Sequence, residues 1–449
     1  MSSTSPAATT SGSMGRALSL LTATSLLSPV AGLVVAPILA HAFDPTDRGV
    51  LAAAIAPSTL ILSVATLGLP EALTYFCANV RWRTRALLLR ASGLTFLLWL
   101  VLLGLTVVFT PQLSKDDAQL ARLILLAGVI ILPALMVNLL RGAAVGLHAW
   151  NVVALERVVL AVARIFVFGG LYLSGHLTLL TAVVAAVGLP AAAGLVYLGV
   201  CVFRSEPAPP GEDRVVRTGE FMRYGLRVWL GSIASILLAR VDQLLMTPLS
   251  SAYDLGIYAV AVTVSELPMV ASGAVQSALF GINSRDRDAD KLALAGRLFF
   301  ILASLGCIAV AVTLPLWIGN VFGNDYRAAV GPTILLLAGS LIVIPATSAG
   351  TALNAWGRPE LRSIGLLITL AVNLVLLFVL VPRYGVYGAC YASIVGSLVF
   401  AGLLLGFASR VTGLTVRAFV LPRAGDITTL YHLSTKFGRK ILRRTAADD

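Results

Sequence analysis

Long uncharged runs of apolar residues constrain this chain more than any other feature of its sequence. A transmembrane helix needs about 20 consecutive apolar residues, whereas strands of a membrane β-barrel alternate apolar and polar residues over about ten positions. Only 12% of the 449 residues are charged, which is about half of the share in a soluble domain. The runs therefore predict an all-α polytopic membrane protein. They cover 17–43, 49–70, 91–114, 123–140, 165–203, 267–284, 298–324, 328–357, 363–382 and 384–409.

Twelve helices are expected when the longest run is divided at Ser174-Gly175-His176 and the flanking apolar residues are included. Arg16 and the first run have the order of a secretory signal, but 27 uncharged residues exceed the length of a signal's apolar core. We therefore expect this segment to stay in the protein as its first helix. The twelve helices are expected at 17–43, 49–76, 91–112, 123–147, 153–173, 178–203, 224–248, 255–282, 298–319, 328–352, 361–381 and 386–408.

Lysine and arginine residues are distributed unevenly between alternate loops. The two terminal segments and every second loop carry 26 of the 33, and Arg164 and Arg240 lie inside expected helices. The other loops carry five, which are Arg48, Lys115, Arg122, Arg327 and Arg383. Cytoplasmic loops of membrane proteins accumulate Lys and Arg. We therefore expect a multi-pass membrane protein with both termini in the cytoplasm. The same rule explains the net charge of +12 without nucleic acid as a partner.

An internal repeat is indicated by two matches at nearly the same spacing. Asp47–Ala54 aligns with Asp254–Ala261 at an offset of 207, and Leu147–Trp150 aligns with Leu353–Trp356 at an offset of 206. Since six is an even number, both six-helix halves enter the membrane in the same orientation, as in transporters that rock two bundles around a central site. The expected parts are a disordered cytoplasmic tail (1–13), two six-helix bundles (14–203 and 222–409), a Pro-rich cytoplasmic linker (204–221) and a basic cytoplasmic tail (410–449).

Short motifs in a fixed order extend over about 14–410. They are Ala36-Pro37-Ile38-Leu39-Ala40 with Asp44-Pro45-Thr46-Asp47-Arg48-Gly49, Leu67-Gly68-Leu69-Pro70-Glu71-Ala72-Leu73, Arg240-Val241-Asp242 with Gly256-Ile257-Tyr258-Ala259, Phe322-Gly323-Asn324-Asp325-Tyr326, Asn354-Ala355-Trp356-Gly357-Arg358-Pro359 and Pro382-Arg383-Tyr384-Gly385-Val386-Tyr387-Gly388-Ala389. In this order they resemble the polysaccharide flippases of the multidrug/oligosaccharidyl-lipid/polysaccharide exporter superfamily.

This resemblance implies a V-shaped, MATE-like pair of bundles around a cavity that opens alternately to the two sides of the membrane. Relatives move undecaprenyl-pyrophosphate-linked sugars from the cytoplasmic to the outer leaflet. The implied partners are therefore a polyprenyl-linked glycan, membrane lipids and glycosyltransferase or glycan-polymerising proteins. The lipid II flippase branch usually has fourteen helices, and no further apolar run follows residue 410.

Three arginines are candidates for binding the pyrophosphate of such a substrate. A guanidinium binds phosphate oxygens in bidentate fashion, and a charge in mid-membrane usually faces a bundle interior or a cavity. Arg240 is the first candidate because it lies about 16 residues, or roughly 24 Å, into its expected helix. An ion pair with a neighbouring helix is the alternative for Arg240. Arg164 and Arg141 are also candidates, for which snorkelling toward head groups is the alternative.

Acids and amides inside the expected helices are candidates for coupling and for lining the cavity. Removal from water favours the neutral form of a carboxyl group, so a buried acid can exchange H⁺ or bind Na⁺ as the cavity turns over. Asp242, Glu266 and Glu71 are such acids, with a purely structural role as the alternative. The amides could also form hydrogen bonds between helices. They are Asn138, Gln243, Gln276 and Asn373.

Enzymatic motifs are absent from the sequence. We find no P-loop, no dinucleotide-binding glycine motif, no metal-ligand cluster and no nucleophile elbow, so no cofactor and no catalytic residue are expected. Cys77, Cys201, Cys307 and Cys390 have no metal-ligand spacing. A cation-coupled multidrug antiporter, a non-transporting scaffold and a membrane-embedded glycosyltransferase or ligase remain the alternatives. A cationic cavity favours the flippase, whereas an apolar cavity with unpaired acids favours the antiporter.

Overall fold

The structure, a computed structural model, describes residues 24–80, 83–197, 216–269 and 289–421. These ranges are almost entirely helical. Several expectations fall wholly or partly outside them: the tail 1–13, most of the linker, the cavity role of Gln276, the end of the basic tail, and parts of the helices expected at 17–43, 178–203 and 255–282.

The first half of the chain forms a bundle in which α5 packs on α6, α6 on α8, and α2 on α7. Its helices are α2 (Leu27–Ala42), α3 (Pro45–Val64), α4 (Leu69–Asn79), α5 (Thr84–Ser114), α6 (Ala118–Gly146), α7 (Trp150–Leu173) and α8 (Leu179–Ala193), which the 3₁₀ turn η2 (Gly194–Tyr197) follows.

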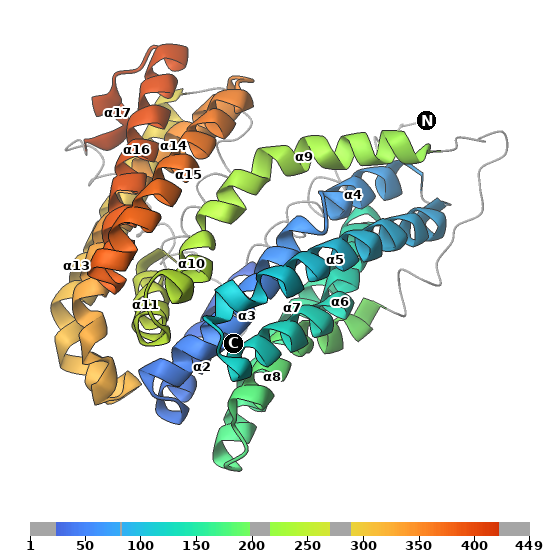
Figure 1. The fold of residues 1–449 in the computed structure, drawn as a ribbon. Coiled ribbons are helices and arrows are strands. Elements are labelled where there is room, and N and C mark those ends of the chain that lie inside the picture. Colours follow the sequence, from blue (N-terminus) through green and yellow to red (C-terminus); the bar gives the residue numbers. More distant parts are fainter. Residues whose placement is uncertain (1–23, 81–82, 198–215, 270–288, 422–449) are drawn as a thin grey trace, which may run out of the picture.

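The second half forms another group of helices, in which α14 and α15 pack on α16, and α13 packs on α14. The two groups lie at an angle and converge where α3 and α11 meet (Figure 1). The elements of this half are α9 (Thr218–Leu238), α10 (Val241–Leu249), α11 (Ala252–Ser265), α13 (Ala289–Phe322), η3 (Asn324–Ala329), α14 (Val330–Ala355), α15 (Pro359–Tyr384), α16 (Val386–Thr412) and α17 (Val416–Val420).

Polar caps begin the helices that follow four short turns. The Asp44 carboxylate accepts a hydrogen bond from the Asp47 backbone N–H at 2.7 Å, and Pro45 occupies the first turn of α3. Asp117, Thr178 and Ser251 cap α6, α8 and α11 in the same way. A side-chain oxygen at this position satisfies a backbone N–H that has no partner within the helix. These turns can therefore be short and still end one helix and begin the next.

The two halves meet closely at the two glycines that the sequence repeat aligns. A Cβ added at Gly49 would lie 1.7 Å from the Ala252 carbonyl oxygen, and one added at Gly256 would lie 1.8 Å from the Pro45 carbonyl oxygen. Pro45 and Ala252 are themselves separated by the repeat offset of 207. The contact is therefore reciprocal between α3 and α11, and only glycine allows the two backbones to approach this closely.

Hydrogen bonds reinforce this meeting point. The Tyr326 hydroxyl, on a side chain that is 1% exposed, donates to the Phe43 carbonyl oxygen at 2.9 Å. The Lys115 ammonium donates to the Ser250 carbonyl oxygen at 2.5 Å. Each of these bonds joins the first half of the chain to the second.

Two of the expected continuous helices are broken, which corrects the prediction for 49–76 and 224–248. The first break separates α3 from α4, where Leu67 and Gly68 have positive φ angles of 41° and 70°. A Cβ at Gly68 would lie 2.2 Å from the Gly225 carbonyl oxygen, so the break lets α9 approach. The second break separates α9 from α10 at Arg240, and neither proline nor glycine lies next to it.

The start of α9 packs on the first half of the chain, although the sequence placed it in the second bundle. The Tyr224 ring stacks on the Tyr75 ring at 4.7 Å, and Phe221 packs beside Phe76. Further along, α9 contacts α15 of the second half. This helix therefore connects the two groups along its length.

Within the described ranges, nine helical segments are long and apolar enough to cross a membrane. Of the other expected spans, α2 is apolar but has 16 residues, α7 carries three charged residues, and α11 is described for 14 residues. The chain is therefore a multi-pass helical membrane protein, as its uncharged runs predicted.

Candidate functional site

A central cavity of about 420 Å³ lies between the two halves of the molecule. Residues of α2, α3, α7 and α8 form one wall, and residues around α10 and α11 form the other. Most of the first wall is apolar, with Leu39, Leu51, Ile55 and Phe168 among its residues. The charged groups must therefore decide what polar ligand the cavity accepts.

Three arginines from three different parts of the chain line this cavity. Arg48 comes from the first turn of α3, Arg164 from the middle of α7 and Arg240 from the break between α9 and α10. Among the described residues of the lining, Glu266 carries the one carboxylate. The formal charge of the lining is therefore three positive groups against one negative group.

None of these three guanidinium groups forms a hydrogen bond or an ion pair within the described part of the chain. The Nε atom of Arg48 is buried and has no partner there. A buried donor that lacks a partner costs about 1–3 kcal/mol, and more when it is charged. The cluster therefore leaves positive charge and hydrogen-bond donors that no described side chain satisfies.

Local structure places each arginine in the cavity. Asp44 caps α3 one turn before Arg48 and so fixes the direction of that helix. Gly32 of α2 lies opposite Arg164, and a Cβ at Gly32 would be 4.0 Å from the Arg164 guanidinium. Arg240 was expected deep inside a continuous helix, but it lies at the helix break, where its side chain is exposed to the cavity.

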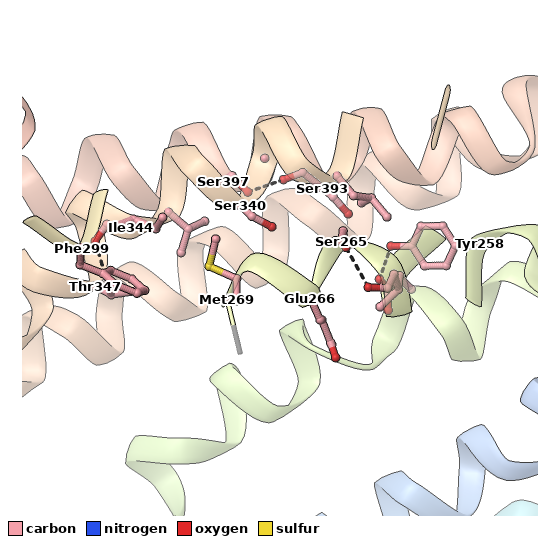
Figure 2. Close-up of a pocket in the computed structure, with 15 residues that line it drawn as sticks. Tyr258, Ser265, Glu266, Met269, Phe299, Ser340, Ile344, Thr347, Ser393 and Ser397 are labelled. Atoms are coloured by element: carbon pink, nitrogen blue, oxygen red, sulfur yellow. Dashed lines mark hydrogen bonds between the residues drawn. The ribbon is translucent and has the colours of Figure 1, made fainter. Parts of the chain in front are cut away.

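A second cavity, of about 510 Å³, lies within the second half of the chain between α10, α11, α13, α14 and α16 (Figure 2). Asp242 is its most enclosed acid. The Tyr258 hydroxyl and the Gln243 backbone N–H both donate to the Asp242 carboxylate. Hydroxyl groups of Ser265, Ser340, Thr347, Ser393 and Ser397 also line the space.

Glu266 belongs to the lining of both cavities. It follows the last residue of α11, and its backbone N–H bonds to the Val262 carbonyl oxygen at 3.1 Å. In Figure 2 its side chain points away from the hydroxyl groups of the second cavity. Glu266 therefore stands in the wall between the two spaces.

A third space, a crevice of about 340 Å³, contains the other predicted polar residues of the first half. Glu71, Asn138 and Arg141 line it, together with Thr74 and Ile236. It lies along α3, α4 and α6, and the described parts of its lining share no residue with the central cavity. These three candidates therefore occupy a different place from Arg240.

Arg141 is held in an ion pair that the sequence reasoning did not identify. Its Nη2 and Nε atoms donate to the two carboxylate oxygens of Glu156, at 2.9 and 3.2 Å. Asn138 accepts from Nη1 at 2.9 Å, and the Tyr197 hydroxyl donates to Glu156 at 3.2 Å. The Glu156 side chain is fully buried, while Arg141 is 31% exposed.

The structure thus brings together Arg164, Arg240, Gln243 and Glu266, with Asp242 in the adjoining cavity. Asn373 instead lies buried between α15 and α16, where it donates to the Ala392 carbonyl oxygen at 3.3 Å, and it lines none of the three spaces described above.

Sequence reasoning missed Arg48, which it counted among the external loop charges. The available signal was its position in the Asp44–Gly49 motif that supports the family resemblance. Among the described residues, no group of three His, Cys, Asp or Glu side chains is placed to hold a metal ion.

Solved structures of other membrane proteins share the fold of this chain. The "Lipid II flippase MurJ, inward closed conformation" has a TM-score of 0.67 at 12% identity and covers 93% of this chain and 92% of its own. An inward-facing multidrug resistance MATE family transporter of the MOP superfamily has a TM-score of 0.64 at 14% identity and covers 87% and 95%. At such identities the likeness concerns the fold alone. It confirms a MATE-like helical fold, whereas the twelve helices in two six-helix repeats stay a prediction.

Two comparisons of sequence point to one family. The curated "Probable flippase AglR" of Haloferax volcanii is 26% identical over 197 residues, so the match spans 41% of this chain and 40% of that protein's length. A family described as "Polysaccharide biosynthesis protein" matches residues 14–285, which is more than half of the chain. The resemblance predicted from the short motifs is therefore confirmed, and the chain belongs to the polysaccharide biosynthesis protein family.

Proposed function

We propose that this protein is a flippase for oligosaccharide or polysaccharide precursors linked to a polyprenyl pyrophosphate. It moves them from the cytoplasmic to the outer leaflet of a bacterial-type plasma membrane by alternating access. The observation that carries the proposal is the cluster of three unpaired arginines in the central cavity. A pyrophosphate is the one strongly anionic part of such a substrate.

The cavity contains both charged and apolar side chains, which match the anionic pyrophosphate and the apolar parts of the substrate. Hydrogen bonds to charged groups contribute about 1.5–3 kcal/mol each, so three guanidinium groups can offset the removal of a pyrophosphate from water. Aliphatic residues such as Leu39 and Ile55 supply an apolar wall beside the arginines. The polyprenyl tail has no need of a polar passage, because it can remain in the lipid.

Alternating access requires two bodies that move about a shared contact. We propose twelve transmembrane helices arranged as two parallel six-helix repeats, with both termini in the cytoplasm. The reciprocal contact of Gly49 with Ala252 and of Gly256 with Pro45 supports this arrangement, since residues that the repeat aligns occupy equivalent places in it. The rocking of the bundles would then take place about the crossing of α3 and α11.

An ion gradient is the proposed energy source, because the chain carries no nucleotide-binding motif. Asp242 and Glu266 are the proposed coupling acids, and H⁺ or Na⁺ is the proposed ion. The Tyr258 phenol and the surrounding hydroxyl groups support this role for Asp242, since they supply oxygen atoms around it. Glu71 is the third proposed coupling acid, at the separate crevice.

The proposal is tested by measuring a surface glycan in cells that depend on this chain. Arg240→Ala should abolish export while the protein still accumulates in the membrane. Arg358→Ala is the matched control. It removes an exposed arginine that lies away from the cavity and forms an ion pair with Glu360 at 3.6 Å. Full export by the Arg240→Ala variant would contradict the proposal.

A cation-coupled antiporter for amphiphilic compounds is the second candidate. The cavity around Asp242 and Glu266 favours it, because this space joins carboxylates to apolar side chains such as Phe299 and Met269. Deletion of the gene would then raise the sensitivity of cells to cationic compounds and leave the surface glycan unchanged.

A further inference from the structure

Glu266 lines two cavities at once, the central cavity and the second cavity. The helix α11 ends at Ser265, and Pro268 follows two residues after Glu266. Proline has no backbone N–H and cannot continue the hydrogen-bond pattern of a helix. Before this proline, Glu266 keeps helical backbone angles and its backbone N–H still bonds to the Val262 carbonyl oxygen, while its side chain is exposed.

The two acids of the second cavity differ in the hydrogen bonds that their carboxylates accept. Asp242 accepts hydrogen bonds from the Tyr258 hydroxyl and from the Gln243 backbone. Glu266 forms no side-chain hydrogen bond or ion pair within the described residues, although Arg240 is a charge that acts on it. A carboxylate without fixed partners can change its direction at little cost.

The charged groups that face Glu266 come from both sides. Arg48, Arg164 and Arg240 share the central cavity with it, and Asp242 and Tyr258 share the second cavity. Of these charges, Arg240 is the one that acts on the Glu266 carboxylate, and it attracts it. In the empty protein, electrostatics therefore favours a Glu266 carboxylate turned toward the arginine cluster.

We propose that Glu266 is an internal competitor of the anionic substrate, whose carboxylate partly neutralises the arginine cluster and turns toward the second cavity when a pyrophosphate binds. This inference rests on the proposed flippase function and assigns to Glu266 a role in setting affinity. The competition serves turnover. Three guanidinium groups without a counter-charge would hold a pyrophosphate strongly in the resting complex, and tight binding of this kind does not speed a transport cycle.

The competitor role predicts that loss of the Glu266 charge changes substrate affinity and glycan export in opposite directions. Glu266→Gln removes the competing charge but keeps the size of the side chain. Binding of geranylgeranyl pyrophosphate to the purified protein should tighten roughly tenfold, since one like charge near the ligand is lost. Export of the surface glycan should fall, because release becomes slow. Glu266→Asp keeps the charge and should bind the probe nearly as the unchanged protein does.

A double-mutant cycle locates the competition. In an Arg240→Ala background, Glu266→Gln should tighten binding of the probe much less than it does alone, since Arg240 is the arginine for which both anions compete. Glu360→Gln is the control for net charge, because it removes an exposed carboxylate of the α15 N-terminus. It should leave the affinity unchanged.

The outcomes separate this inference from the function on which it rests. If the arginine variants bind the probe as well as the unchanged protein does, the proposed function fails. If the arginine variants lose binding but Glu266→Gln leaves affinity unchanged or weakens it, the competitor role alone is overturned. Weaker binding together with weaker export in Glu266→Gln would indicate a structural role and would also overturn it.

Discussion

Arginines occur in two contrasting settings within this membrane protein. In the first half of the chain, Arg141 forms a two-point ion pair with the fully buried Glu156, and Asn138 and Tyr197 complete the network. In the central cavity, Arg48, Arg164 and Arg240 have no such partner among the described residues.

The presence or absence of a carboxylate partner distinguishes a structural arginine from a candidate binding residue. An arginine whose carboxylate partner is fixed by further hydrogen bonds has its charge already compensated and connects α6 to α7. An arginine that lacks a partner carries an uncompensated cost, which a ligand of opposite charge removes when it binds. Depth in the membrane is therefore a weaker guide than pairing.

The largest effect on stability is expected from breaking the paired setting. Glu156→Gln leaves the Arg141 guanidinium without a counter-charge, and the loss of one member of a buried pair costs about 3–5 kcal/mol. Thermal unfolding of the purified protein in detergent should show a clearly lower midpoint. Glu360→Gln, in an exposed pair, should change the midpoint little. An unchanged midpoint for Glu156→Gln would remove the distinction between the two settings.

Truncation of an unpaired arginine in the central cavity should instead weaken ligand binding and leave the fold intact. Arg48→Ala and Arg164→Ala each remove charged hydrogen bonds of about 1.5–3 kcal/mol, so the affinity for geranylgeranyl pyrophosphate should fall about 10- to 100-fold. The thermal midpoint should stay the same or rise, because an uncompensated charge is removed. A midpoint as low as that of Glu156→Gln would show that these arginines are structural.

Replacement of Arg48 by lysine should reduce the affinity for the probe less than replacement by alanine does. Arg48→Lys keeps the positive charge but loses the planar, two-point geometry that suits phosphate oxygens. We expect an affinity between those of the unchanged protein and of Arg48→Ala, measured by titration with the same probe. An affinity equal to that of Arg48→Ala would mean that geometry matters and charge does not.

The smallest effect is expected where the two halves meet, away from either arginine setting. Tyr326→Phe removes the hydrogen bond to the Phe43 carbonyl oxygen, which is worth about 1 kcal/mol. The thermal midpoint should fall slightly, and the affinity for the probe should not change. A large loss of affinity would place this contact within the binding site.

Much of the fold could be predicted from the sequence because a bilayer restricts the choice of structure. The apolar runs located the helices, and the aligned repeat ranges contain Gly49 and Gly256, which meet in the structure. The helix break at Arg240 could not be predicted, since its local sequence contains neither proline nor glycine. Tertiary packing of α9 against both halves accompanies that break.

The site was predicted only in part, for a physical reason. The sequence shows which charges lie in apolar surroundings, but it does not show which of them are paired. In the sequence, Arg141 and Arg164 are both arginines in apolar surroundings and cannot be told apart. In the structure, Arg141 pairs with Glu156 of the next helix. Arg48 looked like a loop charge because it lies one turn inside α3, and only the direction of that helix places its side chain in the cavity.

Translocation by the purified protein tests the central claim most directly. The protein would be reconstituted in liposomes that contain a fluorescent polyprenyl-pyrophosphate saccharide, and the fraction that crosses the bilayer would be measured over time. The unpaired arginine cluster predicts that the unchanged protein moves the lipid, and that Arg240→Ala, at equal protein content and equal thermal midpoint, does not. Equal rates for the two proteins would contradict the account.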